Sequence, residues 1–242
     1  MAVEKGDAAQ FLDSPELYDA IYHFKNYARE AERLREIIIK AAPGARTILD
    51  VACGTGEHSR FLKDYFSVDG VDIRESYLIA ARQKNPAGRY LRADMTAFDL
   101  QVRYDVVTCL FSAIGYVGTL ERLERAITCM GRHLNPGGIL LVEPWFPPGR
   151  WKPGLVSINS GEIPGGAVCR MSLSRREGQL SVMSLHYLAG TVEGVRHYSE
   201  RLALGLFTRE EMERAFERAG LRVSYENDGL MGRGMYYGRL SP

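Results

Sequence analysis

Cysteine and histidine are scarce and scattered in this chain, which argues against several kinds of site. The 242 residues include four cysteines and five histidines. No cysteines have C-x-x-C spacing, and no two histidines occur at positions i and i+4. Neither a metal site nor a disulfide framework is therefore expected. Cys109 and Cys129 lie in apolar segments typical of buried thiols.

Long apolar runs and an excess of one charge are also missing. The N-terminus MAVEKGDAAQ lacks the apolar core of a signal peptide, and no stretch approaches the roughly 18 apolar residues of a membrane span. Lys+Arg 31 against Asp+Glu 30 gives a net charge of +1, which provides no basic field for nucleic acid. We expect a cytoplasmic protein that acts on small molecules, with neither nucleic acid nor a membrane as partner.

The most informative stretch of the chain is RTILDVACGTGEHS, residues 46–59. It predicts a strand, a tight glycine turn and a helix. Gly54 and Gly56 allow backbone angles and a close approach that a Cβ would prevent. A nucleotide-like ligand can therefore lie against the main chain where the helix begins.

The residues around these glycines narrow the choice of ligand. A dinucleotide-binding G-x-G-x-x-G motif has a third glycine where this chain has Ser59, and the Gly-Lys-Ser/Thr ending of a phosphate-binding loop is missing. Asp50, ahead of the first glycine, is a carboxylate that suits a cationic amino group. The alternative is an ordinary glycine-rich turn in a protein without a nucleotide ligand.

Further acids follow at the ends of the next predicted strands. Residues 66–72 alternate in a β-type pattern that ends at Asp72, where α/β nucleotide folds bind ribose because one carboxylate can accept from both hydroxyls. The alternative for Asp72 is a cap for the helix predicted over 75–85. The run 88–95 gives a third short strand and contains Asp94.

Two more strands extend the predicted parallel sheet. Residues 104–111 are almost continuously apolar, as expected of a central strand, and 112–116 follow at its ligand-binding end. A helix over 120–133 is stopped by Asn-Pro-Gly-Gly at 135–138, and 139–143 form the fifth strand. The order βαβαβαβαβ predicts an α/β, doubly wound sheet with right-handed crossovers.

The chain before the glycine motif is predicted to be helical. Ser14 begins one helical pattern, and a second runs from Tyr27 to Ala41. We interpret residues 1–45 as an N-terminal helical lid whose aromatic side chains orient a ligand. A helix hairpin with surface tyrosines is the alternative.

An inserted sheet is predicted over residues 147–206. Strand-like alternation covers 155–163, 167–175, 179–187 and 195–204, with glycine-rich turns between them. This small antiparallel sheet either selects the substrate or covers an edge or a dimer contact. The core domain, 46–146 and 207–242, then closes with a capped helix and two strands, 221–226 and 235–240.

The motif D-x-x-C-G-T-G resembles motif I of the class I S-adenosylmethionine-dependent methyltransferases. A narrower resemblance is to the TDP-amino-sugar N,N-dimethyltransferases of macrolide antibiotic biosynthesis, carried by LYDAIY, KNYAREA, LDVACGTGEHS, LFSAIGYVGT, VEPWFPP, RHYSERLALGLF and GRGMYYG. It implies S-adenosylmethionine as cofactor, no metal, and a doubly wound, seven-stranded, mostly parallel methyltransferase sheet with a small antiparallel β insert. Glu57 and His58, which follow the glycine loop, are a departure of this chain from the family.

The resemblance also implies which residues form the site. The residues expected to bind the cofactor are Tyr27, Asp50, Ala52, Gly54, Gly56, Asp72, Ile73, Asp94, Met95 and Leu110. Those expected to orient the acceptor for catalysis are Tyr18, Tyr116 and Arg233. Those expected to bind the substrate are Tyr22, Ser112, Trp145, Arg170 and Arg175, with the facing of the insert arginines left open.

The function implied is transfer of methyl to the amine of a TDP-amino sugar, to the dimethyl product, by an enzyme that can form a homodimer. The alternative is a small-molecule N- or O-methyltransferase with a non-sugar acceptor. A nucleic-acid amine methyltransferase is disfavoured, because residues 110–113 read Leu-Phe-Ser-Ala and not Asn/Asp-Pro-Pro-aromatic. A catalytically silent binding protein would be expected to have lost Asp50, the glycines or Asp72.

Overall fold

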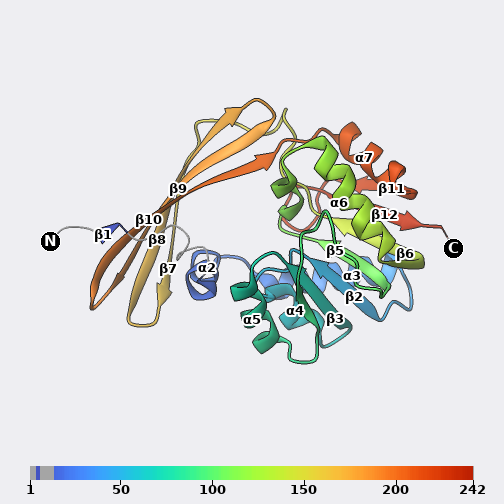
Figure 1. Ribbon diagram of the computed structural model, residues 1–242, viewed down its shortest axis with the longest axis horizontal. Helices are drawn as coiled ribbons and strands as arrows, with labels where there is room; N and C mark the ends of the chain where they lie inside the picture. The colour runs from blue at the N-terminus through green and yellow to red at the C-terminus, as the bar shows by residue number, and fades with distance from the viewer. Residues whose placement is uncertain (1–3, 6–13, 242) are drawn as a thin grey trace. The chain divides into compact units, whose positions relative to one another are not determined.

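The computed structural model describes residues 4–5 and 14–241, and the chain forms two compact units (Figure 1). The larger unit comprises Tyr27–Arg150 and Gly205–Pro242, and the smaller comprises Met1–Asn26 and Trp151–Leu204. These units divide the chain differently from the domains expected above, because the helix that begins at Tyr27 belongs to the larger unit. The lid role of residues 1–45 stays a prediction.

Seven strands within the described part of the larger unit form one sheet, in the order β11-β12-β6-β5-β2-β3-β4. Its strands are β2 (Thr47–Val51), β3 (Ser67–Asp72), β4 (Tyr90–Arg92), β5 (Tyr104–Cys109), β6 (Leu134–Val142), β11 (Leu221–Glu226) and β12 (Met235–Leu240). Strands β2 to β6 are parallel, while β12 is antiparallel to both β6 and β11. The predicted doubly wound, mostly parallel sheet is confirmed.

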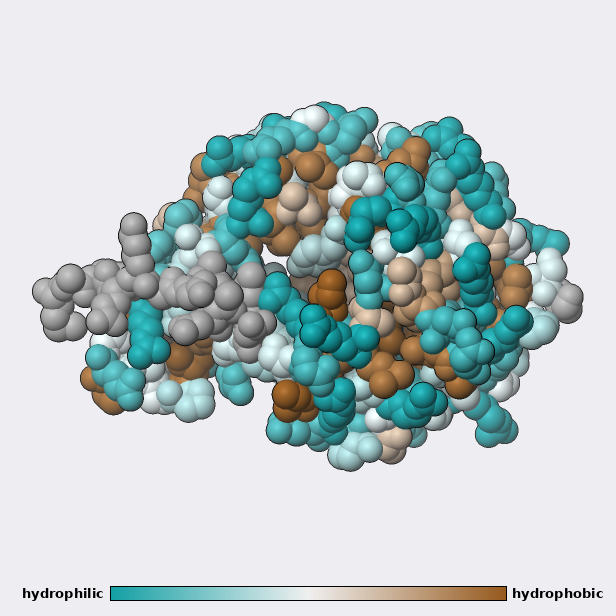
Figure 2. Space-filling model, in the orientation of Figure 1, coloured by the Kyte–Doolittle hydropathy of each residue, from teal (hydrophilic) through white to brown (hydrophobic). Residues whose placement is uncertain are grey.

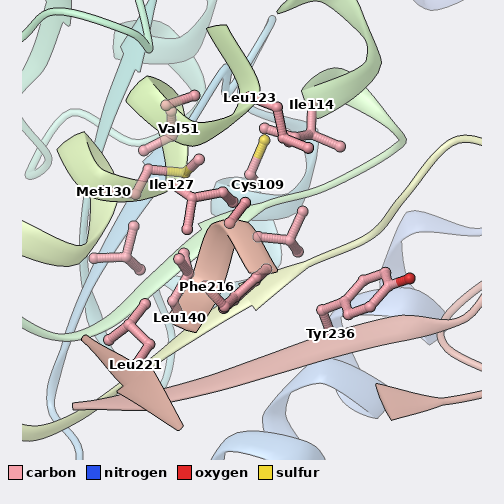
Figure 3. Packing of buried hydrophobic residues seen from close by; sticks show 14 of the residues in the cluster. Val51, Cys109, Ile114, Leu123, Ile127, Met130, Leu140, Phe216, Leu221 and Tyr236 are labelled. Atoms are coloured by element: carbon pink, nitrogen blue, oxygen red, sulfur yellow. The ribbon is translucent and has the colours of Figure 1, made fainter. Parts of the chain in front are cut away.

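Helices cover both faces of this sheet. They are α3 (Tyr27–Ala41), α4 (Glu57–Leu62), α5 (Glu75–Lys84), the 3-10 helix η1 (Ala113–Val117), α6 (Leu120–Arg132) and α7 (Arg209–Arg218). Neighbouring residues of one strand point to opposite faces, so Ile48 packs with α3 and Leu49 packs with α6 and α7. Figure 3 shows the hydrophobic cluster on the side of α6 and α7, which contains Met130 of α6, Phe216 of α7 and Leu140 of β6. The sheet is therefore a rigid base for the loops at its edges.

The Asn-Pro-Gly-Gly segment behaves differently from the expectation. Helix α6 ends at Arg132, and residues 135–138 lie inside β6 instead of before it. Leu134 already pairs with Tyr104, and the register then shifts between Tyr104 and Val106. A Cβ on Gly138 would lie 2.8 Å from the carbonyl oxygen of Asn135 and 3.0 Å from that of Asp105. The glycines therefore allow a bulge that keeps β6 close to β5.

The smaller unit contains the predicted antiparallel insert. Its described elements are β1 (Glu4–Lys5), α2 (Pro15–Ile21), β7 (Val156–Ile163), β8 (Gly166–Glu177), β9 (Leu180–Thr191) and β10 (Gly194–Gly205), and the strands of this described part follow the order β1-β10-β9-β8-β7. The pairings of β7 with β8 and of β8 with β9 are antiparallel. Strand β1 runs parallel to β10 and was not predicted, because two residues carry no periodic pattern.

Helix α2 packs against one face of this sheet. Ser14 caps the helix by accepting a hydrogen bond from the Leu17 N–H, as the sequence indicated. Ile21 is buried with Val168 and Leu185 of the sheet. A Cβ on Gly161 of β7 would lie 2.1 Å from the Ala20 carbonyl oxygen, so the glycine lets the helix lie directly on the strand.

The surface is mixed in character. Hydrophilic residues cover much of each unit in the view of Figure 2, with hydrophobic residues scattered among them. Among the described residues, no helix is long and apolar enough to cross a membrane.

Candidate functional site

Most of the site residues predicted in the larger unit lie at the ends of its parallel strands. Asp50 is near the end of β2, Asp72 ends β3, and Asp94 follows β4. Ser112 comes after β5, and Glu143, which was not among the predicted residues, comes after β6; these two strands run parallel to the other three. Parallel strands that end at one edge of an open sheet form its ligand-binding crevice. The structure therefore brings these five side chains to the same edge.

The two glycines of the motif have different roles. Both are left-handed, with φ of +57° at Gly54 and +78° at Gly56. A Cβ on Gly54 would meet nothing within 4 Å, whereas one on Gly56 would lie 2.9 Å from Cα and Cβ of Ala81 in α5. Gly54 thus leaves the open approach expected for a ligand, and Gly56 is required by helix packing. Ala52, with φ of 58°, adopts the left-handed region despite its Cβ, which is a strained conformation.

Asp50 is a buried carboxyl group near the end of β2. It accepts a hydrogen bond from the Thr108 hydroxyl at 2.8 Å. Burial raises its pKa from 3.8 to about 6, an effect that the nearby His58 opposes. A buried carboxylate that lacks a full countercharge favours a cationic ligand, because the ligand offsets the cost of its desolvation.

Asp72 holds the glycine loop in place. Its Oδ2 accepts from the Gly54 N–H at 2.9 Å, and its Oδ1 accepts from the Arg74 N–H at 3.0 Å. Burial raises the pKa of Asp72, although these backbone hydrogen bonds oppose the rise. Each carboxylate oxygen has a second lone pair, so Asp72 can support the loop and still accept from a ribose hydroxyl.

Four other residues expected to bind the cofactor differ in their surroundings. Asp94 accepts from the backbone N–H of Thr96 at 2.8 Å, which lowers its pKa, and its other oxygen lies 3.3 Å from Arg122. Met95 is half-buried beside the core and Ile73 is 59% exposed, so both can offer apolar surface to a ring. Leu110 instead has its side chain in the core, which leaves its main chain for any ligand contact.

Arg233 is enclosed by aromatic rings. Its guanidinium carbon lies 5.5 Å from the centre of the Phe111 ring, 5.2 Å from that of Trp145 and 5.5 Å from that of Phe146. It also donates to the Ser112 hydroxyl at 2.9 Å. Stacking on several rings fixes the plane of an arginine side chain. The structure thus brings together Arg233, Ser112 and Trp145, which are far apart in sequence.

The turn beneath Arg233 is strained and supported by an acid that the sequence reasoning missed. Phe111 and Ser112 have φ of 51° and 61°. Glu143 is fully buried, and its Oε2 accepts from the Phe111 N–H at 2.7 Å. Consecutive left-handed residues persist only where surrounding contacts fix them. Glu143 directly follows the apolar strand β6, and Asp72 is the last residue of β3, so looking for an acid at the end of the fifth parallel strand would have found Glu143. Tyr116, in η1, is 56% exposed.

Tyr18, Tyr22 and Arg170 form a cluster in the smaller unit. Arg170 donates to the Tyr22 hydroxyl at 2.8 Å and to Asn159 at 2.9 Å. The rings of Tyr18 and Tyr22 lie 4.7 Å apart. Arg175 is not part of this cluster. It lies an odd number of residues along β8 from Arg170, so it points from the opposite face, where it donates to Ser184. The two arginines therefore cannot act side by side.

Comparisons with known proteins identify the family to which this chain belongs. A family model for a methyltransferase domain matches residues 48–138. A dTDP-3-amino-3,6-dideoxy-alpha-D-glucopyranose N,N-dimethyltransferase of Streptomyces fradiae is 40% identical over 92% of this chain and 89% of that enzyme. The chain belongs to the sugar N,N-dimethyltransferases.

Other members of the sugar N,N-dimethyltransferases and their solved relatives agree. The dTDP-3-amino-3,4,6-trideoxy-alpha-D-glucopyranose N,N-dimethyltransferase of Streptomyces venezuelae is 38% identical over 94% of this chain and 98% of that enzyme. The sugar N-methyltransferase KedS8 from a Streptoalloteichus species has a TM-score of 0.89 at 38% identity, over 100% of this chain and 99% of its own. CalS10, an amino pentose methyltransferase of Micromonospora echinaspora solved with S-adenosylmethionine bound, has a TM-score of 0.84 at 37% identity, over 93% and 97%.

This sugar N,N-dimethyltransferase therefore uses S-adenosylmethionine and has a small-molecule acceptor. The strand-end residues fit that cofactor. The ammonium group of S-adenosylmethionine suits the buried carboxyl group of Asp50, and its ribose hydroxyls suit Asp72. Gly54 leaves open space beside the main chain in which the cofactor can lie. Among the described residues, no group of three or more His, Cys, Asp or Glu side chains is placed to hold a metal ion.

Proposed function

We propose that the acceptor is the amino group of a dTDP-linked amino sugar, and that the enzyme methylates it twice. The observation that carries this proposal is the identity of 40% and 38%, across nearly the whole chain, to two enzymes named for that reaction. A third relative at 34% identity is named for a 4-amino sugar, whereas these two are named for 3-amino sugars. The test below therefore includes both 3-amino and 4-amino sugars, to determine which ring position carries the methylated amine.

The proposed chemistry needs positioning more than proton transfer. S-adenosylmethionine supplies an electrophilic methyl group on a sulfonium. The protein has to hold the amine in line with it and exclude water, which can lower the barrier by about 7–11 kcal/mol. A neutral amine is already a nucleophile, so no side chain has to remove a proton before transfer. Activity should therefore rise about tenfold per pH unit below the pKa of the acceptor ammonium, and then level off.

We assign the proposed orienting role in the larger unit to Arg233 and Tyr116. The three rings and Ser112 hold the Arg233 guanidinium in one plane, so it can donate to sugar or phosphate oxygens without first losing conformational freedom. Tyr116 presents an exposed phenol from η1. The roles of Tyr18, Tyr22 and Arg170 rest on the family resemblance, and substitutions at these positions should raise the acceptor KM.

A homodimer is part of the proposal. The sheet face of the smaller unit opposite α2 carries Ile158, Met171 and Leu173, exposed by 66%, 50% and 42%. Ile158 pairs with Met171 across β7 and β8, so these side chains form a continuous apolar surface. Light scattering should give twice the mass of the chain. A monomer at all concentrations would remove this part of the proposal and leave the reaction unaffected.

The reaction is tested by turnover with methyl-labelled S-adenosylmethionine. The acceptor panel contains dTDP-3-amino and dTDP-4-amino sugars, the free amino sugars, other sugar nucleotides, and small amines and alcohols. We expect label only in the dTDP-amino sugars, first as a monomethyl and then as a dimethyl product. Label in a hydroxyl or in a non-sugar amine, with none in the dTDP-amino sugars, would favour the non-sugar alternative.

A further inference from the structure

A buried hydrogen bond between two ionisable side chains joins α3 to the first turn of α4, directly after the glycine loop. His58 lies two residues after Gly56, in the first turn of α4, and Glu30 lies in the first turn of α3. The His58 Nε2 donates to the Glu30 Oε2 across 2.9 Å, and the two residues are only 7% and 8% exposed. Desolvation makes such a pair a weak source of stability, because its attraction must first repay the loss of water. Its placement therefore suggests a role other than stability.

The surroundings of His58 connect the pair to the expected cofactor residues. The ring of Tyr27, at the start of α3, meets the imidazole edge to face with their centres 5.0 Å apart. His58 is also close enough to Asp50 for its charge to oppose the rise in the pKa of that carboxyl group. Tyr27 and Asp50 are both expected to bind the cofactor. His58 therefore contacts or influences two of these residues and is itself held by Glu30.

We propose that Glu30 and His58 are positioning residues for the amino-acid end of S-adenosylmethionine. Glu30 fixes the imidazole, and the fixed imidazole sets the Tyr27 ring and the electrostatic environment of Asp50. Neither residue has to touch the cofactor. This inference concerns the cofactor alone, so it stands or falls independently of the dTDP-amino-sugar acceptor.

Two ligands separate this role from general support of the loop. S-adenosylhomocysteine has the amino-acid end, whereas 5′-methylthioadenosine shares only the adenine, ribose and sulfur. Calorimetry would measure both dissociation constants for the wild type, Glu30→Ala and the conservative Glu30→Gln, whose amide oxygen can still accept from His58. The matched control is Glu213→Gln, which removes the charge of an exposed ion pair with Arg209 on α7.

The proposal predicts unequal losses. Glu30→Ala should weaken S-adenosylhomocysteine binding by about 10- to 100-fold and 5′-methylthioadenosine binding by less than about threefold. Glu30→Gln should restore most of the lost affinity, and Glu213→Gln should change neither value. Adding His58→Ala to Glu30→Ala should cause little further loss, because the two residues act as one unit. Equal weakening of both ligands, or no weakening of either, overturns the proposal. If Glu30→Ala fails to fold, His58→Ala replaces it in the test, because it removes the other half of the same contact and should show the same unequal losses.

Discussion

Replacing Asp50 by asparagine should make the protein more stable and the enzyme worse. Asparagine has nearly the same shape and can still accept the hydrogen bond from Thr108, but it carries no charge. Burial raises the pKa of Asp50 from 3.8 to about 6, so the folded state holds this proton more tightly than the unfolded state. Ionisation of Asp50 therefore opposes folding, and stability is lost as pH rises from about 4 to about 6.

The expected change in the free energy of unfolding follows from the pKa shift of Asp50. A difference of about 2 pKa units corresponds to about 3 kcal/mol above pH 7, as an upper bound, because the asparagine amide also has to find a partner. Urea unfolding of the cofactor-free protein should show Asp50→Asn about 1–3 kcal/mol more stable than wild type at pH 8. That advantage should shrink by up to about 2 kcal/mol at pH 4.5, where wild-type Asp50 is protonated in the folded state.

Cofactor binding should change in the opposite direction. Loss of a charge-assisted interaction with the ammonium should cost about 1.5–3 kcal/mol, or about 10- to 150-fold in the dissociation constant. Wild-type Asp50 is half-protonated near pH 6, so cofactor binding there should release about half a proton, seen by calorimetry in two buffers of different ionisation enthalpy. An Asp50→Asn protein that is less stable than wild type at pH 8, with unchanged cofactor affinity, would refute this reasoning.

Three further substitutions test the other site residues. Asp72→Ala should weaken S-adenosylhomocysteine binding by about 1.5–3 kcal/mol in calorimetry, because the ribose and the Gly54 N–H both lose an acceptor; unchanged affinity would remove Asp72 from the site. Tyr116→Phe should lower kcat/KM by about 10- to 100-fold, or 1.4–2.7 kcal/mol, whereas complete loss of turnover would indicate that the phenol acts as a base. Glu143→Ala leaves the Phe111 N–H without its acceptor, so kcat/KM should fall in steady-state kinetics and the protein should be about 1–3 kcal/mol less stable in urea unfolding. Glu143→Gln should retain most of the activity and the stability. Equal losses in the two variants would contradict a positioning role.

Periodic sequence features predicted the core of the fold well. The alternation and apolar runs of the parallel strands, the two glycines and the acids at strand ends are all local signals, and the structure confirms the sheet they imply. The insert strands were predicted from the same alternation. Strand β1 has only two residues and could not be predicted, and the glycines at 137–138 were taken as a helix stop because a bulge depends on the neighbouring strand.

The parts of the site that depend on distant contacts were harder to infer. Glu30 and His58 are separated by 28 residues, and in sequence Glu30 looks like one more acid on a charged helix. Arg233 is 121 residues from Ser112, so its enclosure by three rings has no local signal, and only the family resemblance pointed to it. The opposite facing of Arg170 and Arg175 follows from the two-residue period of a strand once its pairing is known.

The most direct test of the account is the transfer of labelled methyl to a dTDP-amino sugar, followed by mass spectrometry of the product. The account predicts a mass gain of one methyl group and then of two, both on nitrogen, with no label in the corresponding sugar that has a hydroxyl in place of the amine. Sustained turnover on that hydroxyl sugar, or on an amine without a nucleotide, together with no reaction of any dTDP-amino sugar, would contradict it.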